Sequence, residues 1–142
     1  MSENHITVNA EGIILGRLCS YVAKKALNGY TVDVVNVEKS VLTGTRRVVL
    51  EKFKRFRNMG EPFHGPFIGR SSRDLFKRSL KRMLPHKISR GVEAFARVKA
   101  YKGLPVRYKD TKLETLAGSH VSKVPNTKYV KLERVTEFLG GK

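Results

Sequence analysis

Cysteine is nearly absent from this sequence, with Cys19 the single example in 142 residues. A lone cysteine cannot form an internal disulfide, which excludes the disulfide-held design of small secreted domains. The four scattered histidines provide no pair at metal-ligand spacing, so the sequence supports no zinc-held fold. No run approaches the roughly 20 apolar residues of a spanning helix, and residues 1–11 lack the apolar segment of a secretory signal. We therefore expect an intracellular, cytoplasmic protein with no membrane association.

Acidic residues are scarce in the centre of the chain. The basic region, residues 46–109, contains 19 Lys or Arg against four acids, whereas both flanks are nearly neutral and the whole chain carries +17. A domain that gathers like charge on one region is destabilised by self-repulsion, which an anionic partner relieves. Nucleic acid is therefore the first candidate partner. With 40% hydrophobic residues, the chain can also bury the core of a single domain.

Motifs for catalysis are missing as well. Gly12 and Gly16 follow a candidate strand, as in nucleotide-binding turns, but the chain has no Gly-x-Gly-x-x-Gly and no phosphate loop that ends in Gly-Lys-Ser/Thr. Cys19 lies in an apolar stripe, which favours a core residue over a nucleophile. The acids Glu11, Asp33 and Glu38 show no spacing suited to paired general acid and base work. We expect no enzyme, no cofactor, no metal and no small-molecule substrate.

The first third of the chain predicts a strand, a helix and a strand. Residues 6–9 are β-prone, and apolar residues recur over 15–27 at the spacing of one helix face. Asn28-Gly29 ends this helix, because glycine takes the left-handed conformation at the C′ position without a Cβ clash. Residues 31–37 are rich in β-branched side chains, and 41–43 are a candidate third strand. A helical crossover of this length predicts parallel strands and an α/β fold.

The basic region predicts two helices joined by a loop. Residues 46–57 and 71–84 each combine an apolar stripe with a basic face, and Ser71 and Asp74 have the spacing of a capping box. Five glycines and prolines between residues 60 and 70 favour an ordered or binding loop. A solvated helix face normally mixes both signs of charge, but only Asp74 opposes five bases on the second helix. This asymmetry favours a binding face over a merely solvated one.

Two further signals have open interpretations. Phe63 and Phe67 of the loop, beside His64, could stack on unpaired bases, a mode common in RNA recognition. They could equally pack under the loop, and the sequence does not decide between these alternatives. Arg17 lies near the start of the first helix, where its charge opposes the helix dipole, which favours placement for a partner or an acid.

The C-terminal third predicts less regular structure. Residues 97–101 are a candidate last strand, 106–127 read as an extension with little core, and 132–139 as a short amphipathic helix. We therefore expect a single α/β RNA-binding domain over residues 1–105 and a C-terminal extension over residues 106–142.

Four segments, taken together and in order, resemble the ribosomal protein L13 family (uL13). They are LGRLCS at 15–20, VVNVEK at 34–39, MLPHK at 83–87 and VKAYKGLP at 98–105. The similarity covers roughly Gly12 to Pro105, and the Pro-His-Lys segment resembles the archaeal and eukaryotic branch. Two departures are Arg82, where the family usually has glycine, and Val92, where a polar residue is common.

The resemblance implies a three-layer α/β/α fold on a mostly parallel four-stranded sheet in the order 3-2-1-4, with residues 97–101 as the last strand. It also implies a structural role in the large ribosomal subunit, bound to large-subunit rRNA beside neighbouring ribosomal proteins. The sheet and the first helix would be scaffold, and basic side chains would lie along the rRNA backbone. The candidate RNA-binding residues are Arg17, Arg46, Arg47, Lys54, Arg55, Arg57, His64, Arg70, Arg73, Lys77, Arg78, Lys81, Arg82, His86, Lys87 and Arg90.

Two other functions remain open on the sequence alone. A free RNA-binding regulator of translation would use the same basic surface. A DNA-binding protein could place the basic helix in a major groove, although nothing in the chain indicates the dimer or half-site geometry of that mode.

Overall fold

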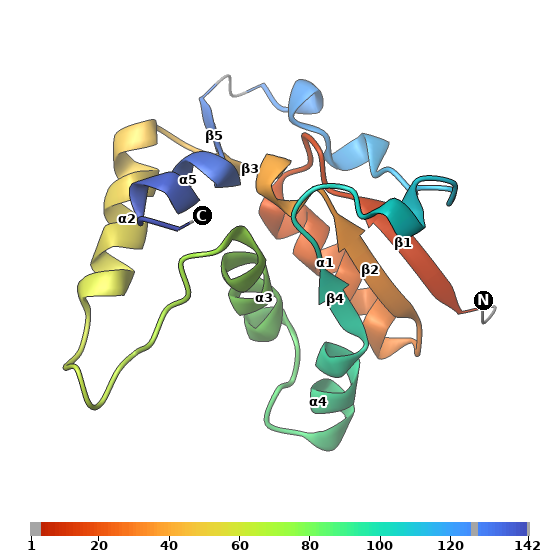
Figure 1. Cartoon of the computed structure of the whole chain (residues 1–142), viewed down its shortest axis with the longest axis horizontal. Helices are drawn as coiled ribbons and strands as arrows, with labels where there is room; N and C mark the ends of the chain where they lie inside the picture. The colour runs from red at the N-terminus through yellow and green to blue at the C-terminus, as the bar shows by residue number, and fades with distance from the viewer. Residues whose placement is uncertain (1–3, 126–127, 142) are drawn as a thin grey trace.

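A parallel sheet with the strand order β1-β2-β4 forms the centre of the fold (Figure 1). The computed structural model describes residues 4–125 and 128–141. Strand β2 (Thr31–Val35) pairs with β1 (His5–Asn9) on one side and with β4 (Val98–Ala100) on the other, both in parallel. Helix α1 (Leu15–Leu27) crosses from β1 to β2, and Gly29, whose φ is 94°, follows its C-terminus. The α/β class and the N-terminal strand, helix and strand are confirmed.

The order of the strands differs from the expected 3-2-1-4. Strand β4 pairs with β2 and not with β1, so the parallel sheet has three described strands with β2 at its centre. Strand β3 (Val41–Thr43) lies outside this sheet and pairs antiparallel with β5 (Tyr129–Lys131). The reason is the short link after β2, which holds only η1 (Val37–Lys39) and one residue on each side. A parallel neighbour would need a crossover of about a dozen residues or more.

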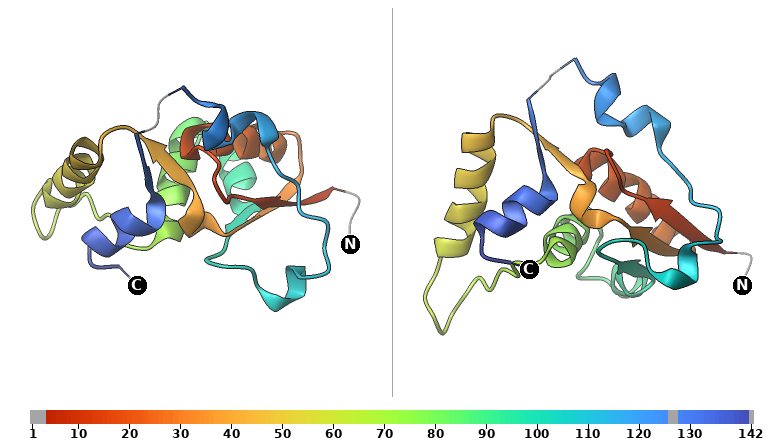
Figure 2. Two further views of the ribbon diagram at one scale, coloured as in Figure 1. Left: turned by 90° about the horizontal axis from the view of Figure 1, so that it is seen from above. Right: turned by 45° about the horizontal axis from the view of Figure 1, so that its top comes forward.

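The apolar face of the sheet packs against helices. The register pairs Ile6 with Val32, and Val8 with Val34, and side chains that are partners in this way share one face. These strand residues form one cluster with the buried stripe of α1, which includes Leu18. Helices α1, α3 (Ser72–Met83) and α4 (Ser89–Ala96) lie on this side of the sheet (Figure 2, left). The core therefore sits between the sheet and these three helices.

The opposite face of the sheet carries the polar side chains of His5 and Asp33 beside the buried Val35, and a 3-10 turn, η2 (Val106–Tyr108), packs against it. Asp33 of β2 is buried there, accepts a hydrogen bond from the hydroxyl of Tyr108 and lies 2.9 Å from Nε2 of His5. Burial, followed by the hydrogen bond to Asp33, raises the pKa of Tyr108 above its ordinary value, so the phenol keeps its proton as the donor. The resemblance implied that helices cover both faces of the sheet, but the 3-10 turn η2 packs against this face.

The C-terminal part of the described chain joins the same core. Helix α5 (Leu132–Phe138) confirms the predicted helix, and Leu132 and Val135 belong to the cluster that includes the sheet residues. In its described residues, the segment between η2 and β5 contains the 3-10 turns η3 (Ala117–Ser119) and η4 (Val121–Lys123), and Glu114 forms a parallel bridge with Val8 of β1. Residues 126 and 127 of the expected extension lie outside the described residues.

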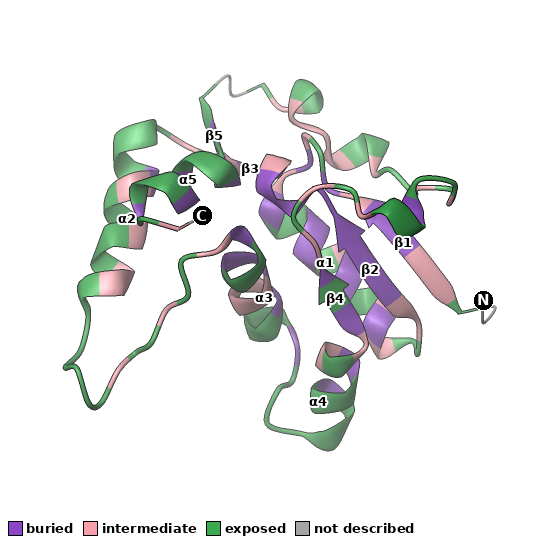
Figure 3. Ribbon diagram, in the orientation of Figure 1, coloured by how far each residue is buried: buried purple, intermediate pink, exposed green. Residues whose placement is uncertain are grey.

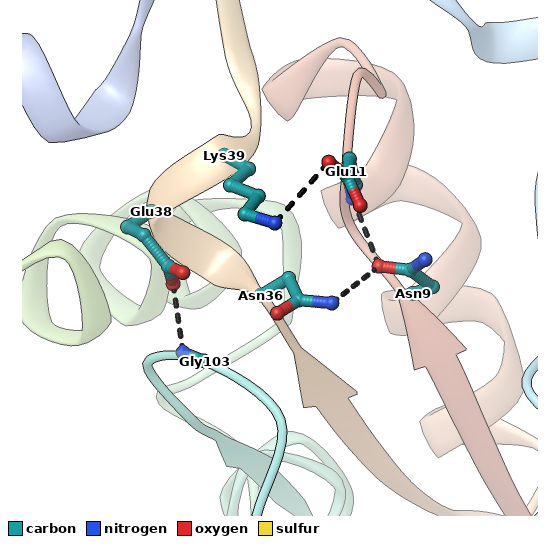
Figure 4. Close-up of polar contacts among 6 residues, drawn as sticks. All are labelled: Asn9, Glu11, Asn36, Glu38, Lys39 and Gly103. Atoms are coloured by element: carbon teal, nitrogen blue, oxygen red, sulfur yellow. Dashed lines mark hydrogen bonds and ion pairs between the residues drawn. The ribbon is translucent and has the colours of Figure 1, made fainter. Parts of the chain in front are cut away.

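Polar groups bond one another where β1 and β2 end (Figure 4). The side-chain amide of Asn36 donates to Oδ1 of Asn9 at 3.0 Å, and Oε2 of Glu38 accepts the backbone N–H of Gly103 at 3.0 Å. Asn36 itself has a left-handed backbone with φ 56°, which begins the turn out of the sheet. In open α/β sheets this edge is the usual ligand position. Here these polar groups hold the strand ends and the turn together.

The first part of the basic region, residues 46–71, lies outside the parallel sheet. Helix α2 (Arg46–Asn58) and α3 confirm the two predicted basic helices, and the loop 59–71 joins them. Val49 is the buried residue of α2, whereas the buried set of α3 includes Leu75, Phe76 and Leu80. Figure 3 shows this contrast, with α2 largely exposed at one side of the molecule. Among the described residues, no helix has the length and apolar character needed to cross a bilayer.

Candidate nucleic-acid interface

Helix α3 presents two opposite faces. Its N-terminus is capped as predicted, because Oγ of Ser71 accepts the backbone N–H of Asp74 at 3.2 Å. The face toward the sheet is buried and largely apolar, while the outward face carries bases along the length of the helix. These exposed or half-buried bases are Arg73, Lys77, Arg78, Lys81 and Arg82. The helix therefore anchors a cationic surface rigidly to the core.

The surroundings of Lys77 on this face lower the pKa of its ammonium group. Its ammonium lies 5.2 Å from the centroid of the Phe95 ring. Burial first, and then the charge of Arg73, lower the pKa of Lys77 below its usual value, while Asp74 acts in the opposite direction. A lysine in a like-charged, partly buried position favours its protonated form more strongly when an anion approaches. This face of α3 is therefore electrostatically suited to binding a polyanion.

Helix α2 carries the second group of candidate bases. Arg46, Arg47, Lys54 and Arg55 are exposed, and Arg57 is half-buried near the C-terminus of the helix. In the described parts of the chain, Arg47 and Arg73 are the candidate cations within 4 Å of a carboxylate, at 3.4 Å from Glu51 and 3.9 Å from Asp74. The other described Lys and Arg candidates have no carboxylate within 4 Å. Solvated surfaces normally mix both signs of charge, so this surface is suited to an external anion.

The loop between α2 and α3 is exposed. Phe63 is 92% and Phe67 77% exposed, which rules out the alternative that these rings pack under the loop. His64 and Arg70 are exposed beside them. Gly60 has φ 84°, and a Cβ at this position would lie 1.7 Å from the carbonyl oxygen of Gly65, so the two ends of the tip approach closely. The loop therefore presents two free aromatic rings at the edge of the basic region.

A third group of candidates lies around the turn between α3 and α4. His86, Lys87 and Arg90 are exposed there, and Gly91 is buried. A Cβ on Gly91 would lie 2.1 Å from the carbonyl oxygen of Pro85, so α4 packs directly on this turn. The close approach fixes the turn against α4 and holds its basic side chains at the surface.

Arg17 is the candidate furthest from the others in sequence. It is exposed on the first turn of α1, and Ser20 follows three residues later on the same helix surface. The hydroxyl of Ser20 lies 3.5 Å from Sδ of Met83, at the end of α3. The fold therefore brings the face of α1 that carries Arg17 to the C-terminal end of the basic helix.

Two residues that the structure places in this surface are absent from the candidates that the sequence pattern indicated. Lys52 and Phe56 lie on α2, and Nζ of Lys52 is 5.9 Å from the centroid of the Phe56 ring. Arg78 and Arg82 of α3 approach the same ring, with Cζ at 5.8 and 5.7 Å. The helical spacing of Phe53 and Phe56 predicted an apolar stripe on α2. It did not predict that cations from α2 and α3 would surround the Phe56 ring.

Cys19 lies in the core and not in a reactive site. It is fully buried on α1, and burial raises the pKa of its thiol to about 12. No group of three or more potential metal-ligating side chains occurs among residues 4–125 and 128–141.

We expect the Cys19 thiol of the folded protein to resist a disulfide reagent at pH 8, because only about one thiol in ten thousand is ionised there. Absorbance after addition of Ellman's reagent measures this, with rapid reaction expected in 6 M guanidinium chloride. The double variant Cys19→Ala, Ser20→Cys moves the thiol to an exposed position on the same helix and should react without denaturant. Fast reaction of the native thiol would contradict the buried assignment.

Comparison with known proteins gives one consistent result. The family model described as Ribosomal protein L13 matches residues 3–107. The large ribosomal subunit protein uL13 of Methanococcoides burtonii is 37% identical over 135 residues, covering 95% of this chain and 97% of that protein. The uL13 of Archaeoglobus fulgidus is 38% identical over 141 residues, covering 99% and 90%. The uL13 of Haloarcula marismortui is 39% identical over 135 residues, covering 95% and 90%.

Proposed function

Because the chain belongs to the ribosomal protein L13 family, we propose that it is a structural constituent of the large ribosomal subunit. The observation that carries this function is the similarity, over 95% of the chain and 97% of the relative, to a protein named large ribosomal subunit protein uL13. Its role is to support the assembled particle in translation, and no catalytic step is assigned to it. Its place in the cell is the ribosome in the cytoplasm.

Large-subunit rRNA is the partner that the exposed charge supports. The candidate bases extend along α2, the loop 59–71, α3 and the turn before α4, with few carboxylates nearby. A-form RNA has a deep, narrow major groove, so proteins recognise it mostly through phosphates, sugars and shape. Lysine would contact phosphates as a point charge, and arginine would hold two oxygens with its planar fork. The protein would thus screen phosphate repulsion where rRNA helices pack closely.

The remainder of the fold serves as a support for this surface. The sheet and α1 provide a buried core against which Leu75, Phe76 and Leu80 of α3 are fixed. Fixing one face of α3 orders the backbone that carries the opposite, basic face. Binding then requires ordering of side chains and not of a whole segment, which lowers its entropic cost.

We assign RNA binding to residues 1–105 and contacts with neighbouring ribosomal proteins to the extension, residues 106–142. Val106, Tyr129 and Phe138 support the second assignment, because these apolar side chains are 77%, 46% and 48% exposed. Exposed apolar side chains of this kind are suited to protein contacts, where their burial becomes favourable.

The affinity for large-subunit rRNA should fall steeply as salt rises. If about six phosphates are neutralised, the logarithm of the association constant should fall against the logarithm of KCl concentration with a slope of about −4 to −5. Filter binding to an rRNA transcript across a KCl series measures this slope. A flat response would contradict the electrostatic mechanism.

A further inference from the structure

A small apolar pocket opens between α2 and α3 in the middle of the basic region. It has a volume of about 130 Å³, well above the roughly 10–15 Å³ that one water molecule needs. Phe53, Phe56, Ile68 and Leu75 provide apolar walls. The rings of Phe53 and Phe56 meet edge to face, with centroids 6.1 Å apart. The pocket thus offers aromatic and aliphatic contact surface at the protein exterior.

Three cations surround one aromatic ring of this pocket. Nζ of Lys52 and the guanidinium carbons of Arg78 and Arg82 all lie 5.7–5.9 Å from the centroid of Phe56. None of the described residues that line the pocket is acidic. Each cation is attracted to the ring, but the three repel one another, and no carboxylate within the lining offsets this repulsion. An anion at the rim of the pocket would offset the repulsion among these three cations.

The polar groups of the pocket wall are few. The hydroxyl of Ser79 already donates to the carbonyl oxygen of Leu75 at 3.1 Å. The wall therefore recognises the flat faces of a ring system better than the hydrogen-bonding edges of a particular base. The occupant that fits is a neutral ring joined on both sides to negative charge.

We propose that this pocket binds one unpaired, extruded nucleobase of RNA, while Lys52, Arg78 and Arg82 hold the flanking phosphates. The proposal rests on the proposed function, because it takes RNA as the partner and adds the structural feature that is recognised. A nucleotide combines a flat ring with an adjoining anion, which matches the apolar walls and the cationic rim together. A paired base cannot enter, since its faces are covered by the stack. The pocket thereby distinguishes a bulged or looped strand from a continuous helix.

Binding of three short RNAs tests this proposal. One hairpin has a single unpaired adenosine in its stem, the second has an abasic residue at that position, and the third is fully paired. Fluorescence anisotropy with the full chain at 150 mM KCl should give at least about five-fold tighter binding to the bulged adenosine, from the usual strength of base stacking on an aromatic ring. Phe56→Leu should abolish this preference, because it keeps an apolar side chain but removes the ring, and Phe56→Trp should retain it.

Phe95→Leu is the matched control. Phe95 is also half-buried with a lysine over its ring, but it lies outside the pocket. Its replacement should leave the preference unchanged, and thermal unfolding should show that all variants are folded. Equal binding of the three RNAs with a steep salt response would overturn the pocket assignment and leave the proposed function intact. Binding to none of them would count against both. Displacement of the bulged RNA by an acidic peptide, dependent on Phe56 and without any base preference, would assign the pocket to a protein segment instead.

Discussion

Replacing Lys77, Arg78, Lys81 and Arg82 together by alanine should weaken binding to large-subunit rRNA by roughly a hundredfold or more at moderate salt. Each of these side chains is exposed or half-buried on the outward face of α3. Loss of four phosphate contacts should also make the salt dependence shallower by about three units of slope. The fold should persist, because removal of like charges relieves repulsion and the lost contacts with aromatic rings are worth only about 0.5–1 kcal/mol each at exposed sites. Filter binding and thermal unfolding measure the two effects.

The matched control removes the same number of charges elsewhere. Lys24, Lys112, Lys123 and Lys131 are exposed and lie outside the basic region. Their joint replacement by alanine lowers the net charge equally but should reduce the affinity far less. An equal loss in both quadruple variants would mean that only net charge matters, and unchanged affinity in the first would move the site away from α3.

Phe76→Ala should lower the free energy of unfolding by about 3–5 kcal/mol. Phe76 is fully buried on the opposite face of the same helix and belongs to the largest buried side chains of the described chain. Its truncation removes apolar contact and leaves a cavity that the surrounding core fills only partly. Urea denaturation followed by circular dichroism measures this change.

Arg73→Ala provides the comparison on the same helix. Arg73 is exposed, and its pair with Asp74 at 3.9 Å is solvated, so its replacement should change stability by no more than about 0.5 kcal/mol. A small effect of Phe76→Ala would contradict the view that α3 fixes the basic face to the core. Together with the quadruple variant, this pair separates the structural face of α3 from its binding face.

Short-range patterns explain why much of the fold could be predicted. The apolar stripe over residues 15–27, the β-branched run after Thr31 and the cap at Ser71 each depend on neighbours within one or two turns, and all appear in the structure. The order of the strands, in contrast, depends on the lengths of the connections between them and on pairing between segments that are far apart in the sequence. The link between β2 and β3 is too short for a parallel neighbour, and the partner of β3 comes from residues 129–131, almost at the end of the chain.

The candidate nucleic-acid interface likewise has features that the sequence predicted and features that only the structure shows. The excess of bases over residues 46–109 is a property of composition, so the sequence predicted it directly. The exposure of Phe63 and Phe67 required the course of the loop, which the sequence left undecided. The cations around Phe56 come from two helices, and their meeting depends on how α2 and α3 pack. No local pattern contains that information.

Sedimentation of the tagged protein from a cell extract, at moderate and raised salt and with each gradient fraction probed for the tag, shows whether the protein is an integral part of the large ribosomal subunit. We expect the tag to migrate with the large ribosomal subunit and to remain there at the raised salt concentration. A tag that stays at the top of the gradient at both salt concentrations would contradict this expectation and favour a free RNA-binding regulator of translation.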